Sequence, residues 1–395
     1  MILVIGDSII DEYLEGSSSR LAPEAPVPVI LNPQKVTRLG GANNVFENLL
    51  ALGPNAEFIS DSTNISKKTR IVSNGGIVAR IDNEQYVPFR PKVDFTQYKY
   101  VILSDYNKGA LHYAADLVKE ANNAGCKVFV DPKKPLGNYQ GAFVVKLNKE
   151  EYKAATGIPW AYEAGPARRL CKLYNIEHLI VTLGEDGVFL YSSQPTEGMS
   201  RLYGIQTKSL DVTGAGDVFM AALVHYYSKG LTLENSLDYA NKFAALSVAH
   251  FGTYILTEED VDAVENDNKI IFTNGVFDVL HKGHLQLLEK SKALGGKLIV
   301  GINSDESAKR LKGESRPVNT AEVRKAMLKA NKHVDEVYVF DEDTPYNLIK
   351  QINPDILTKG GDYKPEDVVG NDLVKVVIIP YVDGYSTTEF LKKYR

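Results

Sequence analysis

Cysteine and long apolar runs are scarce in this chain. Its 395 residues include 2 cysteines, Cys126 and Cys171, which could form only one bridge. Both occur in segments with helical or helix–strand character, so we expect buried free thiols in a reducing compartment. The start, Met1–Gly6, lacks the basic residues of a signal peptide, and no apolar run approaches the roughly 18 residues of a membrane span. We therefore expect a cytoplasmic protein without a membrane partner.

An excess of positive charge is also absent. The chain has 45 Lys and Arg against 50 Asp and Glu, a formal net charge of -5. This balance argues against a nucleic-acid partner, so any anion site must be local. The hydrophobic fraction of 44% and the charged fraction of 24% are ordinary for a soluble globular protein. The length suggests about two to three domains.

One glycine-led helix start lies in the second half of the chain. The apolar run Ile270–Phe272 is followed by Asn274–His284 and then by a helical pattern from Leu285. His281 and His284 are three residues apart, so they should point the same way from the first helical turn. A helix N-terminus binds phosphate through its free N–H groups. Because the chain has 7 histidines, this spacing favours a phosphate site over a chance surface pair.

A second glycine-led helix start lies at Asp211–Asp217, before the apolar residues from Val218 onward. The N–H groups of Gly214, Ala215 and Gly216 would form an anion hole for a transferring phosphoryl group. Asp217 would then be placed to take a proton from an attacking hydroxyl. The alternative is that Asp217 merely caps the helix.

The remaining pattern predicts successive βα units and hence doubly wound parallel sheets. In the first half we expect strands at 2–5, 100–103, 127–130, 144–147 and 178–182, with a helix at 114–124. Asn74-Gly75 predicts a β-hairpin over 68–82, which would form a small lid with a strand at 27–31. In the second half we expect strands at 270–272, 297–302, 337–340, 356–357 and 374–379. Helices are expected there at 283–294, 322–330 and 346–352, with a last helix from Thr387.

The first half resembles the ribokinase-like carbohydrate kinases through D-x-T-G-A-G-D at Asp211–Asp217. The resemblance implies that Asp217 is the catalytic base and that the nucleotide contacts Asn148, Glu151, Thr182, Gly184, Gly187, Gly214, Ala215, Gly216 and Asn241. It implies Mg²⁺ arriving with ATP near Glu151, with no metal site made by the protein alone. Sugar contacts are expected from Asp7, Asp11, Arg20, Gly40, Gly41, Asn44, Arg70, Asp105 and Lys108. Arg20, Arg70, Lys108 or Arg80 would grip a distal phosphate. Gly40 and Gly41 have the alternative of simply allowing close helix packing.

The second half resembles the nucleotidyltransferase superfamily through G-x-F-D-x-x-H-x-G-H at Gly275–His284. The resemblance implies catalytic roles for His281 and His284 on the nucleotide phosphates. Nucleotide contacts are expected from Asn274, Gly275, Phe277, Asp278, Gly283, Lys312, Arg316, Asp362, Ser386, Thr387 and Thr388. A plain helix cap remains the alternative for Ser386–Thr388, and solvated loop charges remain the alternative for Lys312 and Arg316. Arg324 is either structural or a pyrophosphate contact.

Together the halves resemble bifunctional enzymes that phosphorylate heptose 7-phosphate and adenylylate heptose 1-phosphate, which serve ADP-heptose synthesis for lipopolysaccharide core. The predicted fold is α/β with two domains, a ribokinase-like doubly wound sheet with a small β lid at 1–257 and a Rossmann-like nucleotidyltransferase at 269–395. A short linker at 258–268 would join them. Expected partners are ATP and sugar phosphates, with a homodimer as the assembly. Two alternatives remain: another sugar or polyol phosphate used with CTP, and a kinase half that serves only as a binding module.

Overall fold

The structure is a computed structural model that describes residues 1–53, 55–61, 63, 65–193, 198–361 and 363–380. It divides into two compact units, Met1–Val261 and Asp262–Arg395. The segment predicted as a linker, 258–268, forms helix α7 (Glu258–Asn268), and the division falls within this helix. Among the described residues, no helix is both long and apolar enough to cross a bilayer.

The core of the first unit is an eight-stranded sheet in the order β14-β13-β12-β11-β10-β9-β1-β6. Its strands are β1 (Ile2–Gly6), β6 (Ala56–Ile59), β9 (Tyr100–Ser104), β10 (Lys127–Asp131), β11 (Val144–Asn148), β12 (His178–Thr182), β13 (Val188–Ser192) and β14 (Met199–Leu202). All pairings from β6 to β12 are parallel, and β13 and β14 complete the edge in antiparallel fashion. The parallel strands are nearly continuous apolar runs because both faces of the sheet are covered.

Helices cover both faces of this sheet. They are α1 (Ala42–Leu52), α2 (Ala114–Asn123), α3 (Lys149–Thr156), α4 (Ala164–Tyr174), α5 (Ala215–Ser228) and α6 (Leu233–Ser247), with 3₁₀ turns η1 (Phe95–Gln97), η2 (Leu136–Tyr139) and η3 (Gly184–Asp186). The hydrophobic core on one face includes residues of α2, α3 and α4. Helix α5 packs between α1 and α6 and is buried without a break from Asp217 to Tyr226. This burial holds the glycine-led start of α5 at the carboxyl edge of the sheet.

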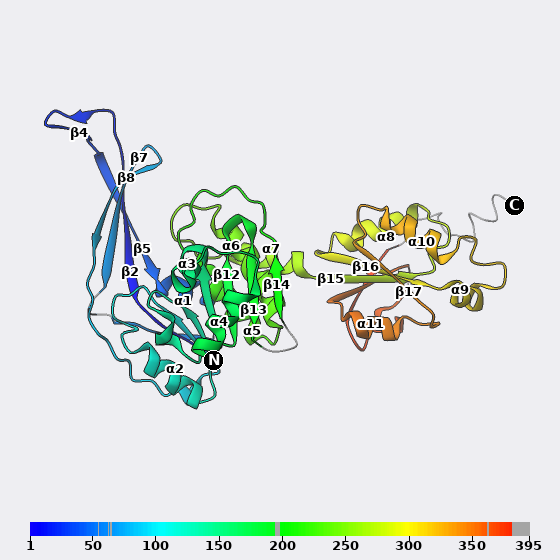
Figure 1. Cartoon of the computed structure of the whole chain (residues 1–395). Helices are drawn as coiled ribbons and strands as arrows, with labels where there is room; N and C mark the ends of the chain where they lie inside the picture. Colours follow the sequence, from blue (N-terminus) through cyan, green and yellow to red (C-terminus); the bar gives the residue numbers. More distant parts are fainter. Residues whose placement is uncertain (54, 62, 64, 194–197, 362, 381–395) are drawn as a thin grey trace. The chain divides into compact units, whose positions relative to one another are not determined.

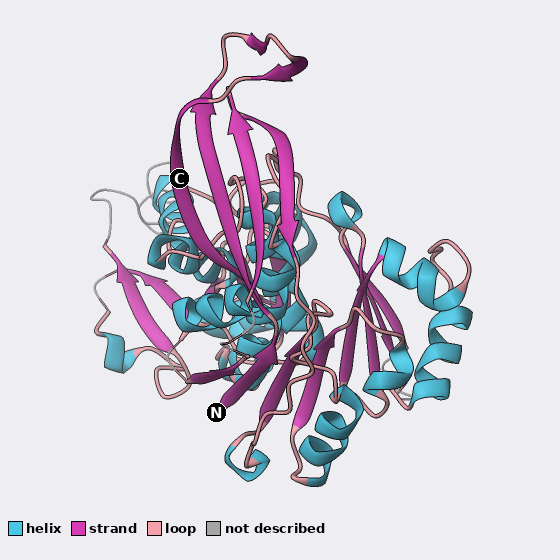
Figure 2. Ribbon diagram, turned by 90° about the vertical axis from the view of Figure 1, so that its left-hand side faces the viewer, coloured by secondary structure: helices cyan, strands magenta, loops and turns pink. Residues whose placement is uncertain are grey.

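A second sheet forms a lid that projects from the core (Figure 1). Its order is β5-β2-β7-β8, from β5 (Leu31–Gly41), β2 (Ser8–Ser17), β7 (Ser66–Ser73) and β8 (Gly76–Asn83). Figure 2 shows these four strands side by side. The guanidinium of Arg38 on β5 ties the lid to the core by donating to the carbonyls of Phe251 and Thr253, at 3.1 and 3.0 Å.

The lid confirms one prediction and corrects another. Strands β7 and β8 pair in antiparallel fashion, and Asn74 and Gly75 between them have positive φ of 51° and 80°, as a tight hairpin turn requires. The predicted strand at 27–31 is wrong, because the chain there ends one strand and begins another. Strand β4 (Ala25–Pro28) pairs with β3 (Leu21–Ala22) at the far end of the lid, whereas Leu31 starts the long strand β5.

The second unit is a five-stranded parallel sheet in the order β17-β16-β15-β18-β19. Its elements are β15 (Ile270–Gly275), β16 (Lys297–Asn303), β17 (Glu336–Phe340), β18 (Ile356–Gly360), β19 (Lys375–Ile379), α8 (Lys282–Lys292), α9 (Asp305–Lys312), α10 (Ala321–Lys329), α11 (Tyr346–Ile352) and η4 (Pro365–Asp367). The strand order reverses between β15 and β18, where open α/β sheets form a ligand crevice. The helix predicted from Thr387 lies outside the described residues.

Candidate active sites

Asp217 lies at the start of α5 in the first unit and is buried, with 3% of its surface exposed. Its carboxylate accepts hydrogen bonds from the Tyr106 hydroxyl at 2.6 Å and from the Asn44 side-chain amide at 3.1 Å. Burial raises the pKa of Asp217 to about 6. Gly214 before it has a φ of 79°, and a Cβ there would lie 2.7 Å from the Asn44 amide nitrogen. The glycine therefore allows the starts of α1 and α5 to meet around a carboxylate with a near-neutral pKa.

A buried ion pair faces the same helix start. Lys146 on β11 pairs with Asp131 on β10 at 2.6 Å, and a Cβ on Gly216 would lie 2.7 Å from the Lys146 amine. Although burial alone would lower the pKa of Lys146, the Asp131 carboxylate raises it, so the amine stays charged. The sequence analysis missed this lysine. It could have been recognised in the sequence, because Lys146 is a charged residue between the apolar residues of a strand that is expected to be buried.

Residues predicted for the kinase nucleotide line a cavity of about 250 Å³ beside this helix start. The predicted residues along its wall are Thr182, Gly184, Gly187, Ala215, Gly216 and Asn241. Asn148 and Glu151 do not line this cavity. They form the capping box of α3, and the Glu151 carboxylate also pairs with Lys133. Both Glu151 oxygens thus have protein partners.

Asp7 and Asp105 hold the loop that carries Tyr106. The Asp7 carboxylate accepts backbone N–H groups of Tyr106, Lys108 and Ala110 at 2.9, 3.1 and 2.8 Å. Asp105 accepts the backbone N–H of the residue two positions on at 2.6 Å and the hydroxyl of Tyr139. In this structure both predicted sugar ligands therefore position the loop beside Asp217.

The inner face of the lid is basic. Asp11 pairs with Arg70 at 2.5 Å, and the Arg70 guanidinium lies 5.3 Å from the centre of the Tyr13 ring. Lys68 is two residues before Arg70 on β7, so it shares this face, and its amine lies 5.9 Å from the centre of the Tyr106 ring. Burial lowers the pKa of Lys68. The sequence analysis overlooked Lys68, although its alternation with Arg70 was a usable signal.

The other residues predicted to bind a distal phosphate, Arg80, Lys108 and Arg20, either pair with acidic residues or lie far from Asp217. Arg80 pairs with Asp82 at 2.6 Å, and Lys108 pairs with Glu84 at 2.8 Å. Arg20 directly precedes β3, so it lies at the far end of the lid rather than beside Asp217 (Figure 1). Gly40 and Gly41 join β5 to α1, with Gly41 at the helix N-cap with a φ of 64°.

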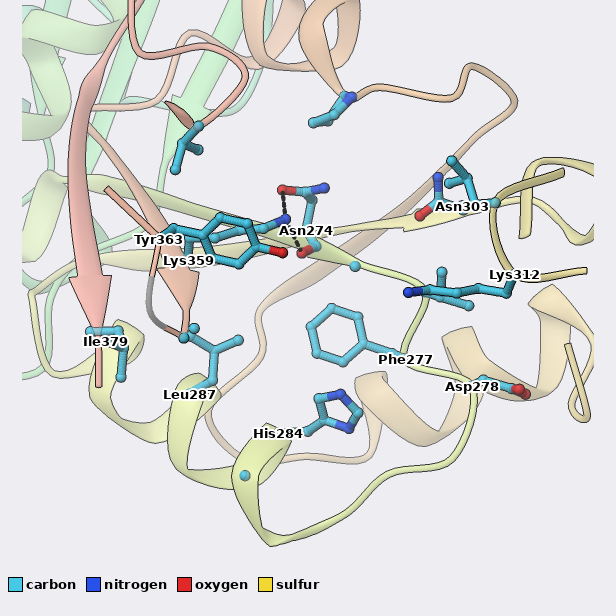
Figure 3. Close-up of a pocket in the computed structure, with 18 of the residues that line it drawn as sticks. Asn274, Phe277, Asp278, His284, Leu287, Asn303, Lys312, Lys359, Tyr363 and Ile379 are labelled. Atoms are coloured by element: carbon cyan, nitrogen blue, oxygen red, sulfur yellow. Dashed lines mark hydrogen bonds between the residues drawn. The ribbon is translucent and has the colours of Figure 1, made fainter. Parts of the chain in front are cut away.

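The second unit contains a pocket of about 950 Å³ over the β15–β18 crevice (Figure 3). Its wall includes all the predicted nucleotide residues that the structure describes: Asn274, Gly275, Phe277, Asp278, His281, Gly283, His284, Lys312 and Arg316. The predicted residues Asp362, Ser386, Thr387 and Thr388 lie outside the described residues. The pocket therefore brings together, at the switch point of the sheet, residues from β15 and the loop after it, from the start of α8, and from the end of α9 and the loop after it.

His281 and His284 face each other at the start of α8, as their spacing predicts. Their rings stack with centroids 3.7 Å apart, and the Phe277 ring lies 5.0 Å from that of His284. Burial lowers the pKa of His281, and burial together with the neighbouring His281 ring lowers the pKa of His284 to about 4. Both imidazoles are therefore neutral at pH 7 and carry one N–H each, and the His284 ring forms a hydrogen bond with the backbone of Val279.

Two predicted transferase residues hold a loop against the pocket. The Asp278 carboxylate accepts the backbone N–H groups of Val318 and Asn319 at 2.7 and 2.9 Å and pairs with Arg316 at 2.6 Å. Arg324 has a structural role. It is fully buried, donates to three backbone carbonyls and pairs with Asp305. A pyrophosphate contact for Arg324 is therefore wrong.

Lys359, at the end of β18, is a lining residue to which the sequence analysis gave no role. Its amine donates to the carbonyl and side-chain oxygens of Asn274 at 3.3 and 3.1 Å (Figure 3). Burial lowers the pKa of Lys359 to about 8, with a smaller contribution from Lys312.

Comparison with known proteins assigns a family to each unit. Residues 62–260 match the pfkB family of carbohydrate kinases, and residues 272–392 match the cytidylyltransferase-like family. The first unit has the ribokinase fold. Ribokinase from Thermotoga maritima covers 67% of this chain and 98% of its own length at 20% identity and a TM-score of 0.56. Arabidopsis thaliana ribokinase complexed with ribose and ATP covers 67% and 97%, at 18% identity and a TM-score of 0.53.

Relatives that match the whole chain carry both units. The bifunctional protein HldE of a Nitratiruptor species is 36% identical over 100% of this chain and 99% of its own length. HldE of Wolinella succinogenes is 37% identical over 99% and 97%. The first alignment spans 466 positions against the 395 residues of this chain, so that relative contains segments that this chain lacks. The chain belongs to the HldE family of bifunctional proteins and is an enzyme with a carbohydrate kinase domain followed by a nucleotidyltransferase domain.

Proposed function

We propose that this protein activates a heptose phosphate in two reactions. The kinase unit transfers the γ-phosphoryl group of ATP to O1 of D-glycero-D-manno-heptose 7-phosphate. After a separate phosphatase removes the 7-phosphate, the transferase unit moves the adenylyl group of a second ATP onto heptose 1-phosphate, giving ADP-heptose and pyrophosphate. The observation that carries this proposal is the match to bifunctional HldE proteins over the whole chain.

In the kinase reaction Asp217 accepts the proton of the anomeric hydroxyl as O1 attacks the γ-phosphorus. The bond from that phosphorus to the β,γ-bridging oxygen breaks, and ADP leaves. The N–H groups of Gly214, Ala215 and Gly216 and the charged amine of Lys146 stabilise the charge on the transferring group. The hydrogen bonds from Tyr106 and Asn44 orient the carboxylate toward the substrate.

Magnesium fits this site as part of MgATP. Mg²⁺ is usually held by one or two carboxylates plus substrate phosphates and keeps several waters. Asp131, Glu151 and Asp217 are the acidic residues whose charges act on Lys146 beside the start of α5, and the first two are free of the role of base. Glu151 would have to release Lys133 to become a direct ligand. When bound, the ion neutralises phosphate charge, while proton transfer remains with Asp217.

In the transferase reaction a phosphate oxygen of heptose 1-phosphate attacks the α-phosphorus of ATP. The neutral His281 and His284 imidazoles and the N-terminus of α8 donate to the nucleotide phosphates, and His284 exchanges its backbone hydrogen bond with Val279 for one to phosphate. Lys312 at the end of α9 and Arg316 on the loop that follows line the same pocket and supply positive charge. Positioning and charge neutralisation supply most of the acceleration in such transfers.

A second candidate uses CTP in place of ATP in the transferase unit, which the cytidylyltransferase-like match favours. The phosphate-binding groups do not read the base, so both nucleotides suit them. The test is pyrophosphate release by the full chain from ATP and from CTP, each with heptose 1-phosphate and with other sugar phosphates. ATP consumption with heptose 7-phosphate tests the kinase unit, and its absence would support the binding-module alternative.

We also propose that the protein acts in the cytoplasm as a homodimer that joins lid to lid. The lid carries exposed apolar side chains, among them Leu21, Leu39, Ile77 and Ile81 at 61, 48, 51 and 57% exposure. Light scattering is expected to give about twice the chain mass of 43.6 kDa. Ile77→Lys with Ile81→Lys is expected to shift the mass to that of one chain, and a wild-type mass of one chain would contradict the proposal.

Lys68 is proposed to bind the 7-phosphate of the heptose, because it shares the inner face of the lid with Arg70 and approaches Tyr106. Lys68→Met is expected to raise the KM for heptose 7-phosphate by about 10- to 100-fold, from the loss of a charge-assisted hydrogen bond. Lys67→Met is the matched control, since Lys67 points to the other face and pairs with Glu12. Equal effects of the two substitutions in steady-state assays would refute the role of Lys68.

A further inference from the structure

Lys359 places a positive charge at the switch point of the transferase sheet. It is the second-last residue of β18, and its amine bonds to Asn274, the second-last residue of β15, so it connects the two strands between which the strand order reverses. Figure 3 shows the amine in the middle of the pocket, with Phe277 and His284 on one side of it. A ligand in this crevice would therefore meet the Lys359 amine.

The surroundings of this amine do not balance its charge. Its two hydrogen-bond acceptors are neutral oxygens of Asn274, and within the described part of the chain it makes no ion pair. The described acidic residues of the pocket wall are Asp278, Asp343 and Asp367. Asp278 pairs with Arg316, Asp343 pairs with Arg310, and Asp367 is exposed on η4 and forms no ion pair with Lys359. Burying an ammonium group without a carboxylate partner destabilises the folded protein. The presence of Lys359 at this position therefore points to an anionic ligand.

The proposed reaction supplies two anions to this crevice. An oxygen of the sugar 1-phosphate forms a bond to the α-phosphorus while the bond to the α,β-bridging oxygen breaks, and pyrophosphate carries that electron pair away. The phosphate nucleophile is already ionised, so the step needs no base. The obstacle is the repulsion between the attacking phosphate and the α-phosphate, which a fixed cation between them reduces.

We propose that the Lys359 ammonium binds phosphate oxygens at this reacting centre and holds the acceptor phosphate against the α-phosphate of the nucleotide. This inference rests on the proposed transferase reaction and adds a residue to it. Lys312, at the end of α9, lies on the other side of the pocket from Lys359, so it is the residue that would bind the outer phosphates of the nucleotide (Figure 3).

The test compares three variants of the full chain. Lys359→Met keeps the length of the side chain and removes the charge, whereas Lys359→Arg restores the charge. Lys364→Met is the matched control, because Lys364 is exposed and does not line the pocket. Each variant is assayed for pyrophosphate release, with the KM for ATP and for heptose 1-phosphate measured separately, and for its melting temperature.

Lys359→Met is expected to lower kcat/KM by at least about 100-fold, with partial recovery in Lys359→Arg and no change in Lys364→Met. Its melting temperature should equal or exceed that of the wild type, because an uncompensated charge has left a crevice, whereas a purely structural lysine would give a decrease. An increase confined to the KM of heptose 1-phosphate assigns the contact to the acceptor phosphate. A decrease in kcat alone assigns it to charge that develops on the α-phosphate.

Two results would overturn the role of Lys359: wild-type kinetics in Lys359→Met, or a loss of activity that accompanies a lower melting temperature and is not recovered by arginine. Failure of the proposed function is distinguishable, since the wild type would then release no pyrophosphate from this substrate pair. In that case calorimetric binding of pyrophosphate still tests the residue. Any pyrophosphate that binds to the kinase unit contributes equally in every variant. An affinity for pyrophosphate that is unchanged in Lys359→Met would therefore refute a phosphate contact of Lys359.

Discussion

Asp217→Asn is expected to reduce heptose 7-phosphate phosphorylation by about 10²- to 10⁴-fold, the usual contribution of a positioned general base. The amide cannot accept the proton of the anomeric hydroxyl. The fold should survive, because the replacement is isosteric and the Tyr106 hydroxyl can accept as well as donate a hydrogen bond. The measurement is kcat for ADP formation. Asp238→Asn is the control, since Asp238 lies on the surface of α6 and pairs with Lys242.

The same substitution is expected to leave pyrophosphate release by the transferase unit unchanged. The two reactions use separate helix starts, one with a carboxylate and one with imidazoles. An equal loss of both activities in Asp217→Asn would refute the two-site description, and full phosphorylation in this variant would remove Asp217 from the mechanism.

The raised pKa of Asp217 gives this reaction a characteristic pH dependence. Burial raises the pKa of the carboxyl to about 6, so it is protonated below that pH and charged above it. Only the charged form accepts a proton, so kcat/KM for phosphorylation should fall about tenfold per pH unit below pH 6. In Asp217→Asn the residual rate should lose this inflection.

His284→Ala is expected to lower kcat for adenylyl transfer by about 10²- to 10³-fold, as the loss of a donor to developing charge typically does. The imidazole is held by stacking on His281, by the Phe277 ring and by a hydrogen bond with the backbone of Val279, so the orientation of its ring in the pocket wall is fixed. Phosphorylation of heptose 7-phosphate should continue at the wild-type rate.

His333→Ala is the matched control for this prediction, because His333 lies in the same unit and outside the pocket wall. Pyrophosphate release is measured with saturating ATP and heptose 1-phosphate. A transferase that is unaffected by His284→Ala would exclude this imidazole from the mechanism.

The two helix starts, at Gly214 for α5 and at His281 for α8, were predictable because their signals are local. A glycine with positive φ, as at Gly214, followed by an apolar helical run specifies a helix start with free N–H groups in any context. The stacked histidines follow from their spacing along one helix. The hairpin at Asn74–Gly75 is local in the same sense. The family resemblances rest on these short motifs, which is why they extended over both units.

The partners of buried carboxylates were not predictable from the sequence. Asp7 and Asp278 each follow a buried strand, which is where ligand-binding residues occur, and both were assigned to ligands. In the structure each instead accepts backbone N–H groups from a distant segment, at Tyr106 and at Val318. Such contacts join residues about 100 and 40 positions apart, so no local pattern signals them.

The sequence by itself determined the positions of the two helix starts, because the glycine turn before α5 and the paired histidines at the start of α8 are local signals. The tertiary structure alone decided which charged side chains lie beside those helix starts. Lys146, Lys68 and Lys359 are unremarkable in sequence, and they enter the sites through parallel pairing of strands and through the fold of the lid. The physical reason is that backbone geometry is set within a few residues, whereas the burial and pairing of a charge depend on whichever segments fold against it.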